Sequence, residues 1–79
     1  MAVVRYYAAA RAAANRTEEP VPAGSLAELL ATLSDRYGER MALLVKASSY
    51  LLDGVSCRDL STPLDEQSTV DILPPFAGG

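Results

Sequence analysis

Residues 25–38, SLAELLATLSDRYG, decide the fold because they carry complete signals for one amphipathic helix. Ser25 and Glu28 form a capping box, in which the Ser25 hydroxyl accepts a hydrogen bond from the Glu28 N–H and the Glu28 carboxylate reaches back to the Ser25 N–H. Leucines at positions 26, 29, 30 and 33 recur on one face together with Tyr37, and Gly38 supplies the C-terminal stop. This helix is predicted to be the main partner of a β-sheet.

The two ends of the chain are predicted to form strands that this helix covers. Residues 3–7 are mostly β-branched or aromatic, which favours a strand. Residues 69–73 favour another, with Val70 and Ile72 directed inward and positions 71 and 73 outward. Because a helix lies between them in the sequence, we expect these two strands to pair in parallel at the centre of the sheet.

Shorter elements are expected in the rest of the chain. The alanine-rich run at residues 8–14 favours a short helix ended by Asn15, and residues 39–46 favour one further helical turn. Asp53-Gly54 is typical of a two-residue hairpin turn, which requires positive φ angles. The remaining strands are expected at residues 17–21, 50–52 and 55–57.

These elements predict an α+β fold of two layers, a mixed sheet of about five strands with one main helix packed across one face. The 79 residues suffice for a single domain, residues 1–79. A content of 49% hydrophobic and 22% charged residues is typical of globular proteins.

The composition argues against several classes of function. The net charge is −3 and the seven basic residues form no run, so no nucleic-acid partner is expected. With no His and one cysteine, Cys57, the chain lacks a set of metal ligands, and Cys57 is interpreted as a small packed hydrophobe. No apolar run approaches the roughly 20 residues that span a bilayer and no signal-like leader is seen, so we expect no membrane partner and a cytoplasmic location.

The chain ends in a segment that is predicted to protrude from the domain, residues 74–79, with the sequence Pro-Pro-Phe-Ala-Gly-Gly. Proline has no N–H donor, so Pro74 and Pro75 stop strand pairing. Glycine has no Cβ, so Gly78 and Gly79 can enter a channel too narrow for other residues and present an unhindered carboxylate. A frayed end on a plain interaction module is the alternative interpretation.

Together these features resemble the ubiquitin-like β-grasp sulfur carriers of the MoaD and ThiS type, most of all the small subunits of molybdopterin synthase (MoaD). The resemblance covers essentially the whole chain. It rests on Val4-Arg5-Tyr6-Tyr7-Ala8 followed by Arg11, where the family has a hydrophobic strand, Phe-Phe-Ala and an arginine. It rests also on Leu73 and the tail, where the family has Pro-Pro-Val-x-Gly-Gly. Gln67-Ser68, Leu52-Asp53-Gly54 and the bulkier Phe76 depart from the family pattern.

The resemblance implies a carrier that is not catalytic alone and binds no cofactor. An E1-like adenylating enzyme would use ATP to adenylate the Gly79 carboxylate. A sulfur donor such as a cysteine desulfurase or rhodanese would then supply the sulfur of a thiocarboxylate. The large, catalytic subunit of molybdopterin synthase would take up Phe76, Ala77, Gly78 and Gly79, and the sulfur would pass to cyclic pyranopterin monophosphate.

Docking to these partners is expected to use Tyr7 and Leu73, on the sheet face away from the helix, with Pro74 and Pro75 at the chain exit. Ordinary packing at the edge of the core is the alternative for Tyr7 and Leu73. For Arg11 a solvated surface charge and an interfacial ion pair are both open. Two other functions would use the same tail: sulfur transfer for thiamin, cysteine or tRNA thiolation, and conjugation to lysines as a ubiquitin-like modifier.

Overall fold

The computed structural model of the chain describes residues 1–75. Within these residues the chain forms five strands and three helices, and all three helices lie in its first 47 residues. In order they are β1 (Ala2–Tyr6), α1 (Ala8–Ala14), β2 (Glu18–Val21), α2 (Leu26–Tyr37), α3 (Glu39–Ala47), β3 (Ser49–Leu52), β4 (Val55–Ser56) and β5 (Thr69–Leu73).

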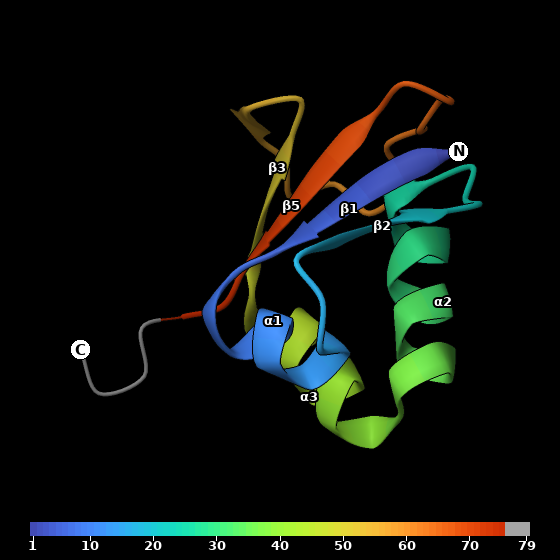
Figure 1. Cartoon of the computed structure of the whole chain (residues 1–79). Helices are drawn as coiled ribbons and strands as arrows, with labels where there is room; N and C mark the ends of the chain where they lie inside the picture. The colour runs from blue at the N-terminus through green and yellow to red at the C-terminus, as the bar shows by residue number, and fades with distance from the viewer. Residues whose placement is uncertain (76–79) are drawn as a thin grey trace.

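The strands form one mixed sheet in the order β2-β1-β5-β3-β4. β1 and β5 come from opposite ends of the chain and pair in parallel, with Val4 opposite Val70 and Tyr6 opposite Ile72. The other pairs are antiparallel. Figure 1 shows β1 and β5 side by side in the middle of the sheet, so the predicted parallel pairing is confirmed.

The helices pack to one side of the sheet and leave its other face uncovered (Figure 1). Each buried leucine of α2 contributes roughly 1.5–3 kcal/mol as an upper value, so this layer supplies much of the core. The largest buried apolar side chains are those of Tyr6, Leu26, Leu29, Leu33, Met41, Ile72, Val4, Val21 and Val70.

Helix α2 begins and ends where the sequence predicts. The Ser25 hydroxyl accepts a hydrogen bond from the Glu28 N–H at 3.2 Å. The return bond was predicted wrongly, because Glu28 Oε1 accepts from the N–H of Gly24 at 3.3 Å and not from Ser25. Gly24 and Leu26 also bond to the backbone of residues 62–64, and this extended approach brings the Gly24 N–H toward the Glu28 side chain. Gly38, with φ of 90°, ends the helix in a conformation that glycine adopts without strain.

The prediction of one main helix was incomplete, because α1 and α3 are full helices as well. Residues 39–46 were expected to form a turn, yet α3 extends over Glu39–Ala47 and buries Met41 and Val45. Five strands spaced ~4.8 Å apart make a sheet about 20 Å wide, whereas a helix with its side chains is about 10–12 Å across. One helix therefore cannot cover the sheet, and α1 and α3 enclose the remaining apolar area.

Strand boundaries differ from the predicted ones by about one residue, within the usual uncertainty of element ends. β1 ends at Tyr6, and Tyr7 is the N-cap residue of α1. The hairpin turn has the predicted positive φ angles, 49° at Asp53 and 85° at Gly54. The Asp53 carboxylate also accepts a hydrogen bond from the Thr69 N–H at 2.9 Å, which ties this turn to the start of β5.

Candidate functional site

The candidate site begins where the chain leaves the sheet. The last residue of β5, Leu73, pairs with Ser49 of β3. Pro74 is buried and Pro75 is exposed, and since neither has an N–H, strand pairing ends there. Figure 1 shows this exit next to the connection between β1 and α1. The predicted tail residues Phe76, Ala77, Gly78 and Gly79 lie outside the described residues.

The predicted docking residues Tyr7 and Leu73 come together at this end of the sheet. Tyr6 pairs in parallel with Ile72, so Tyr7 and Leu73, which follow them, lie at the same end of two adjacent strands. Both Tyr7 and Leu73 are half-buried. Tyr7 was expected to belong to the strand, but its carbonyl already accepts hydrogen bonds from α1, including one of 3.0 Å from Ala10.

Arg11 stabilises the same corner from within the chain. Its Nε donates a hydrogen bond to the Tyr6 carbonyl at 3.4 Å. It therefore bridges the first turns of α1 and the end of β1, and it makes no ion pair among residues 1–75. Its position favours a role in holding Tyr7 at the exit.

The uncovered side of the sheet carries an ion pair that the sequence analysis missed. We call the surface formed by Val3, Arg5, Leu51, Asp71 and Leu73 the open face, because these residues alternate with those that face the helices. Arg5 and Asp71 are direct neighbours on the two central strands. Arg5 Nε and Nη2 donate to Asp71 Oδ1 and Oδ2 at 2.6 and 3.0 Å.

This pair has an exposed member and a buried one. The Arg5 side chain is 45% exposed and the Asp71 side chain 7%. The hydrogen bonds that Arg5 donates to Asp71 raise the pKa of Arg5, which keeps the guanidinium charged. Asp71 was correctly predicted to point away from the helix. Its burial could be found only by adding the parallel register, which places Arg5 directly beside it. The open face thus presents one oriented cation among half-buried apolar side chains.

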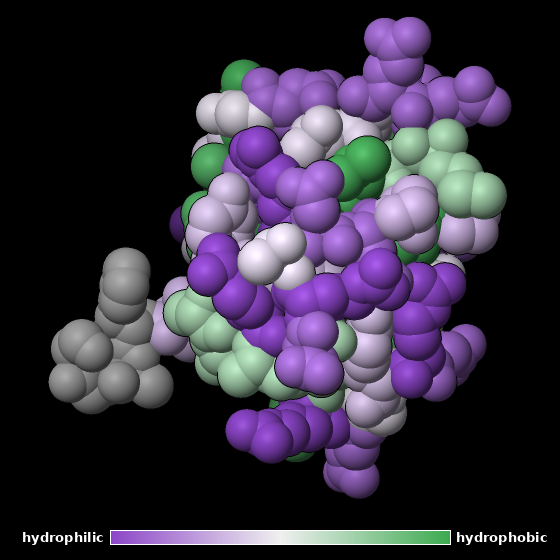
Figure 2. All heavy atoms as spheres, in the orientation of Figure 1, coloured by the Kyte–Doolittle hydropathy of each residue, from purple (hydrophilic) through white to green (hydrophobic). Residues whose placement is uncertain are grey.

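The surface around the exit is mixed in character. Figure 2 shows that this view of the molecule is mostly hydrophilic, with small separate hydrophobic areas. A pale green, weakly hydrophobic area lies beside the exit in Figure 2, and α1, which follows the connection next to the exit, has Ala8, Ala9 and Ala12 exposed. A partner that encloses the tail would therefore meet small apolar side chains at the base of the exit.

A second charged cluster, also missed, lies on the helix side of the sheet. Glu19 of β2 is 1% exposed. Its Oε2 accepts hydrogen bonds from the hydroxyls of Tyr6 and Tyr37. Its Oε1 accepts from Arg36 Nη1 at 2.6 Å and from Arg16 Nη1 at 3.1 Å. From the sequence, Glu19 was placed only within the strand expected at residues 17–21, since no local pattern links it to all four of these residues.

The donors around Glu19 keep it ionised. Burial acts to raise the pKa of Glu19, but the hydrogen bonds from Tyr37, Tyr6 and Arg36 outweigh burial, and the pKa falls below its ordinary value. Burial and the bond to Glu19 raise the pKa of Tyr6, which therefore stays neutral and donates. The Tyr6 and Tyr37 rings also meet edge to face, with centroids 6.3 Å apart. This cluster joins β1, β2 and α2, and its role is structural.

Other chemistry is limited in the described part of the chain. Residues 1–75 contain no group of three or more His, Cys, Asp or Glu side chains placed to hold a metal ion. None of their helices is long and apolar enough to cross a membrane. Cys57 is half-buried against the core with its Sγ 3.3 Å from Thr62 Oγ1, in agreement with a packed cysteine.

A mixed sheet with parallel central strands, helices on one side and a chain that leaves from the central strand is the ubiquitin-like β-grasp fold. The chain belongs to the ThiS family, whose profile matches residues 4–79. It is thus a ubiquitin-like protein of the ThiS family.

Solved structures share this fold. The small archaeal modifier protein 1 (SAMP1) from Methanosarcina acetivorans is 24% identical, with a TM-score of 0.86 over 99% of this chain and 95% of that one. SAMP1 from Haloferax volcanii is 15% identical, with a TM-score of 0.79 over 99% and 98%. A chain in the complex of subunits 1 and 2 of the molybdopterin-converting factor from Helicobacter pylori is 24% identical, with a TM-score of 0.73 over 99% and 97%. No curated protein matches the chain.

Proposed function

We propose that this protein is the sulfur carrier that serves as the small subunit of molybdopterin synthase. An E1-like enzyme adenylates the Gly79 carboxylate with ATP, and a cysteine desulfurase or rhodanese supplies the sulfur that converts it to a thiocarboxylate. The large subunit then uses this sulfur on cyclic pyranopterin monophosphate in molybdenum cofactor biosynthesis. The carrier donates sulfur, and the catalytic side chains belong to its partners.

The chemistry explains why the tail must be thin. A carboxylate is a poor electrophile until one of its oxygens becomes part of a good leaving group, and adenylation achieves this by making AMP the leaving group. The activating enzyme has to enclose the reacting carbon and exclude water from it. Two terminal glycines allow the backbone to enter such a channel, because they have no side chains.

The observation that carries the proposal is the continuity between the folded body and the tail. The family match extends through Gly79, and the central strand β5 leads directly into Pro74 and Pro75. The double proline before the glycine pair resembles the molybdopterin synthase subunits most. The Helicobacter pylori complex supports a large-subunit partner, since a chain of this fold occurs there together with another subunit.

Docking in this proposal uses the exit and the open face together. Tyr7, Leu73 and Pro75 surround the base of the tail next to the buried Pro74, so they contact whichever enzyme encloses the tail. The exposed half of Arg5 adds a directional donor beside them. Charge-assisted bonds of this kind favour a partner with a matching acceptor and disfavour one that buries the cation against apolar groups.

A ubiquitin-like modifier is the second candidate, because two proteins of the same fold are named small archaeal modifier proteins. In that case Gly79 would form an isopeptide bond with a lysine. Conjugates in cell lysate that disappear when Gly79 is deleted would favour the modifier. Sulfur delivery for thiamin, cysteine or tRNA thiolation uses the same thiocarboxylate with a different acceptor.

The test is a reconstitution with thiocarboxylated protein, the large synthase subunit and cyclic pyranopterin monophosphate. We expect molybdopterin to form while intact mass shows return of Gly79 to the carboxylate. If the thiocarboxylate persists and no pterin product appears, the proposed acceptor is wrong and the other sulfur pathways take precedence.

Adding one alanine after Gly79 is expected to abolish sulfur transfer while the fold and docking persist, because the new carboxylate overruns the active site. The matched control adds the same alanine before Met1, where transfer should be unchanged. Normal transfer by the C-terminally extended protein would contradict the tail mechanism.

A further inference from the structure

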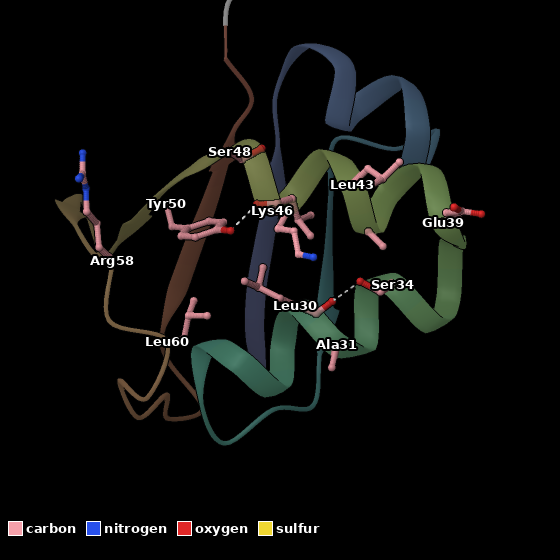
Figure 3. Close-up of a pocket in the computed structure, with 12 residues that line it drawn as sticks. Leu30, Ala31, Ser34, Glu39, Leu43, Lys46, Ser48, Tyr50, Arg58 and Leu60 are labelled. Atoms are coloured by element: carbon pink, nitrogen blue, oxygen red, sulfur yellow. Dashed lines mark hydrogen bonds between the residues drawn. The ribbon is translucent and has the colours of Figure 1, made fainter.

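A groove on the helix side of the molecule belongs to neither the exit nor the open face. It lies between α2 and α3 on one side and β3 with the loop after β4 on the other, and has a volume of about 460 Å³ (Figure 3). Leu60 points into it from the loop and Leu30 from α2, and the Tyr50 ring lies above both of them in this view (Figure 3). The groove is therefore apolar at its base.

The neutral polar groups of this groove are already satisfied within the chain. The Tyr50 hydroxyl donates to the Val45 carbonyl. The hydroxyls of Ser34 and Ser48 donate to carbonyls of their own helices at 3.0 and 2.8 Å. In contrast, two leucines of the lining, Leu43 and Leu60, are 63% and 46% exposed, so the groove leaves large apolar side chains facing water. What an occupant would recognise is thus an apolar surface and the charges around it.

Those charges are mainly basic, on a chain of net charge −3. Arg5, Arg16 and Arg36 form ion pairs, and Arg11 bonds to a carbonyl. Among residues 1–75 the basic side chains with neither an ion pair nor a hydrogen bond are Arg40, Lys46 and Arg58, and two of these, Lys46 and Arg58, line the groove.

Figure 3 shows Lys46 over the middle of the groove and Arg58 at one end, with the acidic Glu39 at the opposite end. The charge of the groove is therefore polarised along its length, from basic at Arg58 and Lys46 to acidic at Glu39. An apolar segment that carries acidic residues toward one end fits this pattern when that end lies at Lys46 and Arg58.

We propose that this groove docks an acidic amphipathic segment of a partner protein, with its apolar side chains against Leu30 and Leu60 and its carboxylates at Lys46 and Arg58. The groove lies on the helix side of the sheet, so a partner that covers the open face leaves Leu30, Lys46 and Leu60 accessible, and only the Ser48 end of the groove adjoins the exit. A second partner can therefore bind the carrier while the first acts on it. This inference does not depend on the chemistry of Gly79.

The probes are two short helical peptides with the same leucine pattern, one with glutamates and one with lysines at the flanking positions. They are titrated into the full chain while amide shifts are followed by NMR. We expect the glutamate peptide to perturb residues around Leu30, Val45 and Leu60, and to bind about tenfold more tightly than the lysine peptide.

Charge reversal sharpens the test. The Lys46→Glu, Arg58→Glu double variant should bind the lysine peptide more tightly than the glutamate peptide, the reverse of the natural chain. Arg40→Glu is the matched control, since it reverses another unpaired cation of α3 outside the groove and should leave the preference unchanged. The amide spectra of the variants without peptide report whether they are folded.

Equal binding of both peptides, or no shifts at the groove, would overturn the proposal. Shifts of the same residues on raising the concentration of the chain itself, or on adding a peptide of residues 74–79, would overturn it in favour of a second copy or the tail. Sulfur transfer in the reconstitution is expected to be normal in the double variant, so failure of this inference and failure of the carrier function are distinguishable.

Discussion

Glu19 and Asp71 are carboxylates on opposite faces of one sheet, and the chain holds them in different ways. Glu19 faces the helices and accepts hydrogen bonds from four side chains that come from β1, α2 and the segment before β2. Asp71 faces away from the helices and accepts side-chain hydrogen bonds from Arg5 alone among the described residues. Both are almost fully buried, with exposures of 1% and 5%.

The difference shows that a buried carboxylate can stabilise the interior or shape a surface. Glu19 joins the strands β1 and β2 to the end of α2, which the backbone hydrogen bonds of the sheet do not do. Arg5 and Asp71 lie on strands that backbone hydrogen bonds already hold together. Their pair mainly fixes the direction of the Arg5 guanidinium on the open face, where a partner would meet it.

The largest expected effect is the loss of Glu19. Glu19→Ala should lower the free energy of unfolding by about 3 kcal/mol, because it leaves two tyrosine hydroxyls and two arginines without their acceptor. Chemical denaturation followed by circular dichroism measures this value. The control is Glu18→Ala at the exposed neighbouring position, which should change stability by less than about 0.5 kcal/mol. Equal effects of the two substitutions would show that the cluster contributes nothing specific.

A smaller effect is expected from acid. The pKa of Glu19 is lowered in the fold from its ordinary value of 4.5, so on acidification the unfolded chain takes up the proton first. The stability that Glu19 contributes is therefore fully present above pH 4.5 and is lost as the pH falls through the lower pKa of the folded state. Denaturation midpoints measured from pH 7 to about pH 3 should fall more steeply for the natural chain than for Glu19→Gln.

Asp59 provides the comparison for this pH dependence. Hydrogen bonds from Ser61 lower the pKa of Asp59 as well, but this residue is exposed. Asp59→Asn should therefore reduce the fall of the denaturation midpoint at low pH less than Glu19→Gln does. The reverse order would show that surface carboxylates, and not the cluster, govern the acid sensitivity.

The contrast between the two faces also shows what the sequence could predict. Local signals were sufficient for α2 and for the Asp53-Gly54 turn, because caps and turn residues act over a few neighbouring residues. The parallel central strands followed from the helix that lies between them in the sequence. The extent of α3 was missed, since its apolar face is recognisable only against the full width of the sheet. The fold class followed from these elements and from the resemblance at both ends of the chain.

The site was predictable in part. Tyr7 and Leu73 were found from the predicted strand pairing, whereas Arg5 and Asp71 required the register as well. Glu19 could not be found, because its partners are scattered between positions 6 and 37 and meet only in the folded chain. The roles of Gly78 and Gly79 remain predictions from the tail motif and the family resemblance.

The smallest effect on stability is expected on the open face, and its asymmetry is informative. Arg5→Leu leaves the buried Asp71 carboxylate without a partner, whereas Asp71→Ala leaves Arg5, which is already half exposed, free to be hydrated. Arg5→Leu should therefore destabilise more than Asp71→Ala, and the double variant should recover much of the loss. A double-mutant cycle by chemical denaturation measures the coupling.

If both single variants are as stable as the natural chain but bind the large synthase subunit more weakly, the pair acts entirely on the docking surface. If both lose as much stability as Glu19→Ala, the open face is held as firmly as the interior, and the distinction between the two carboxylates does not hold.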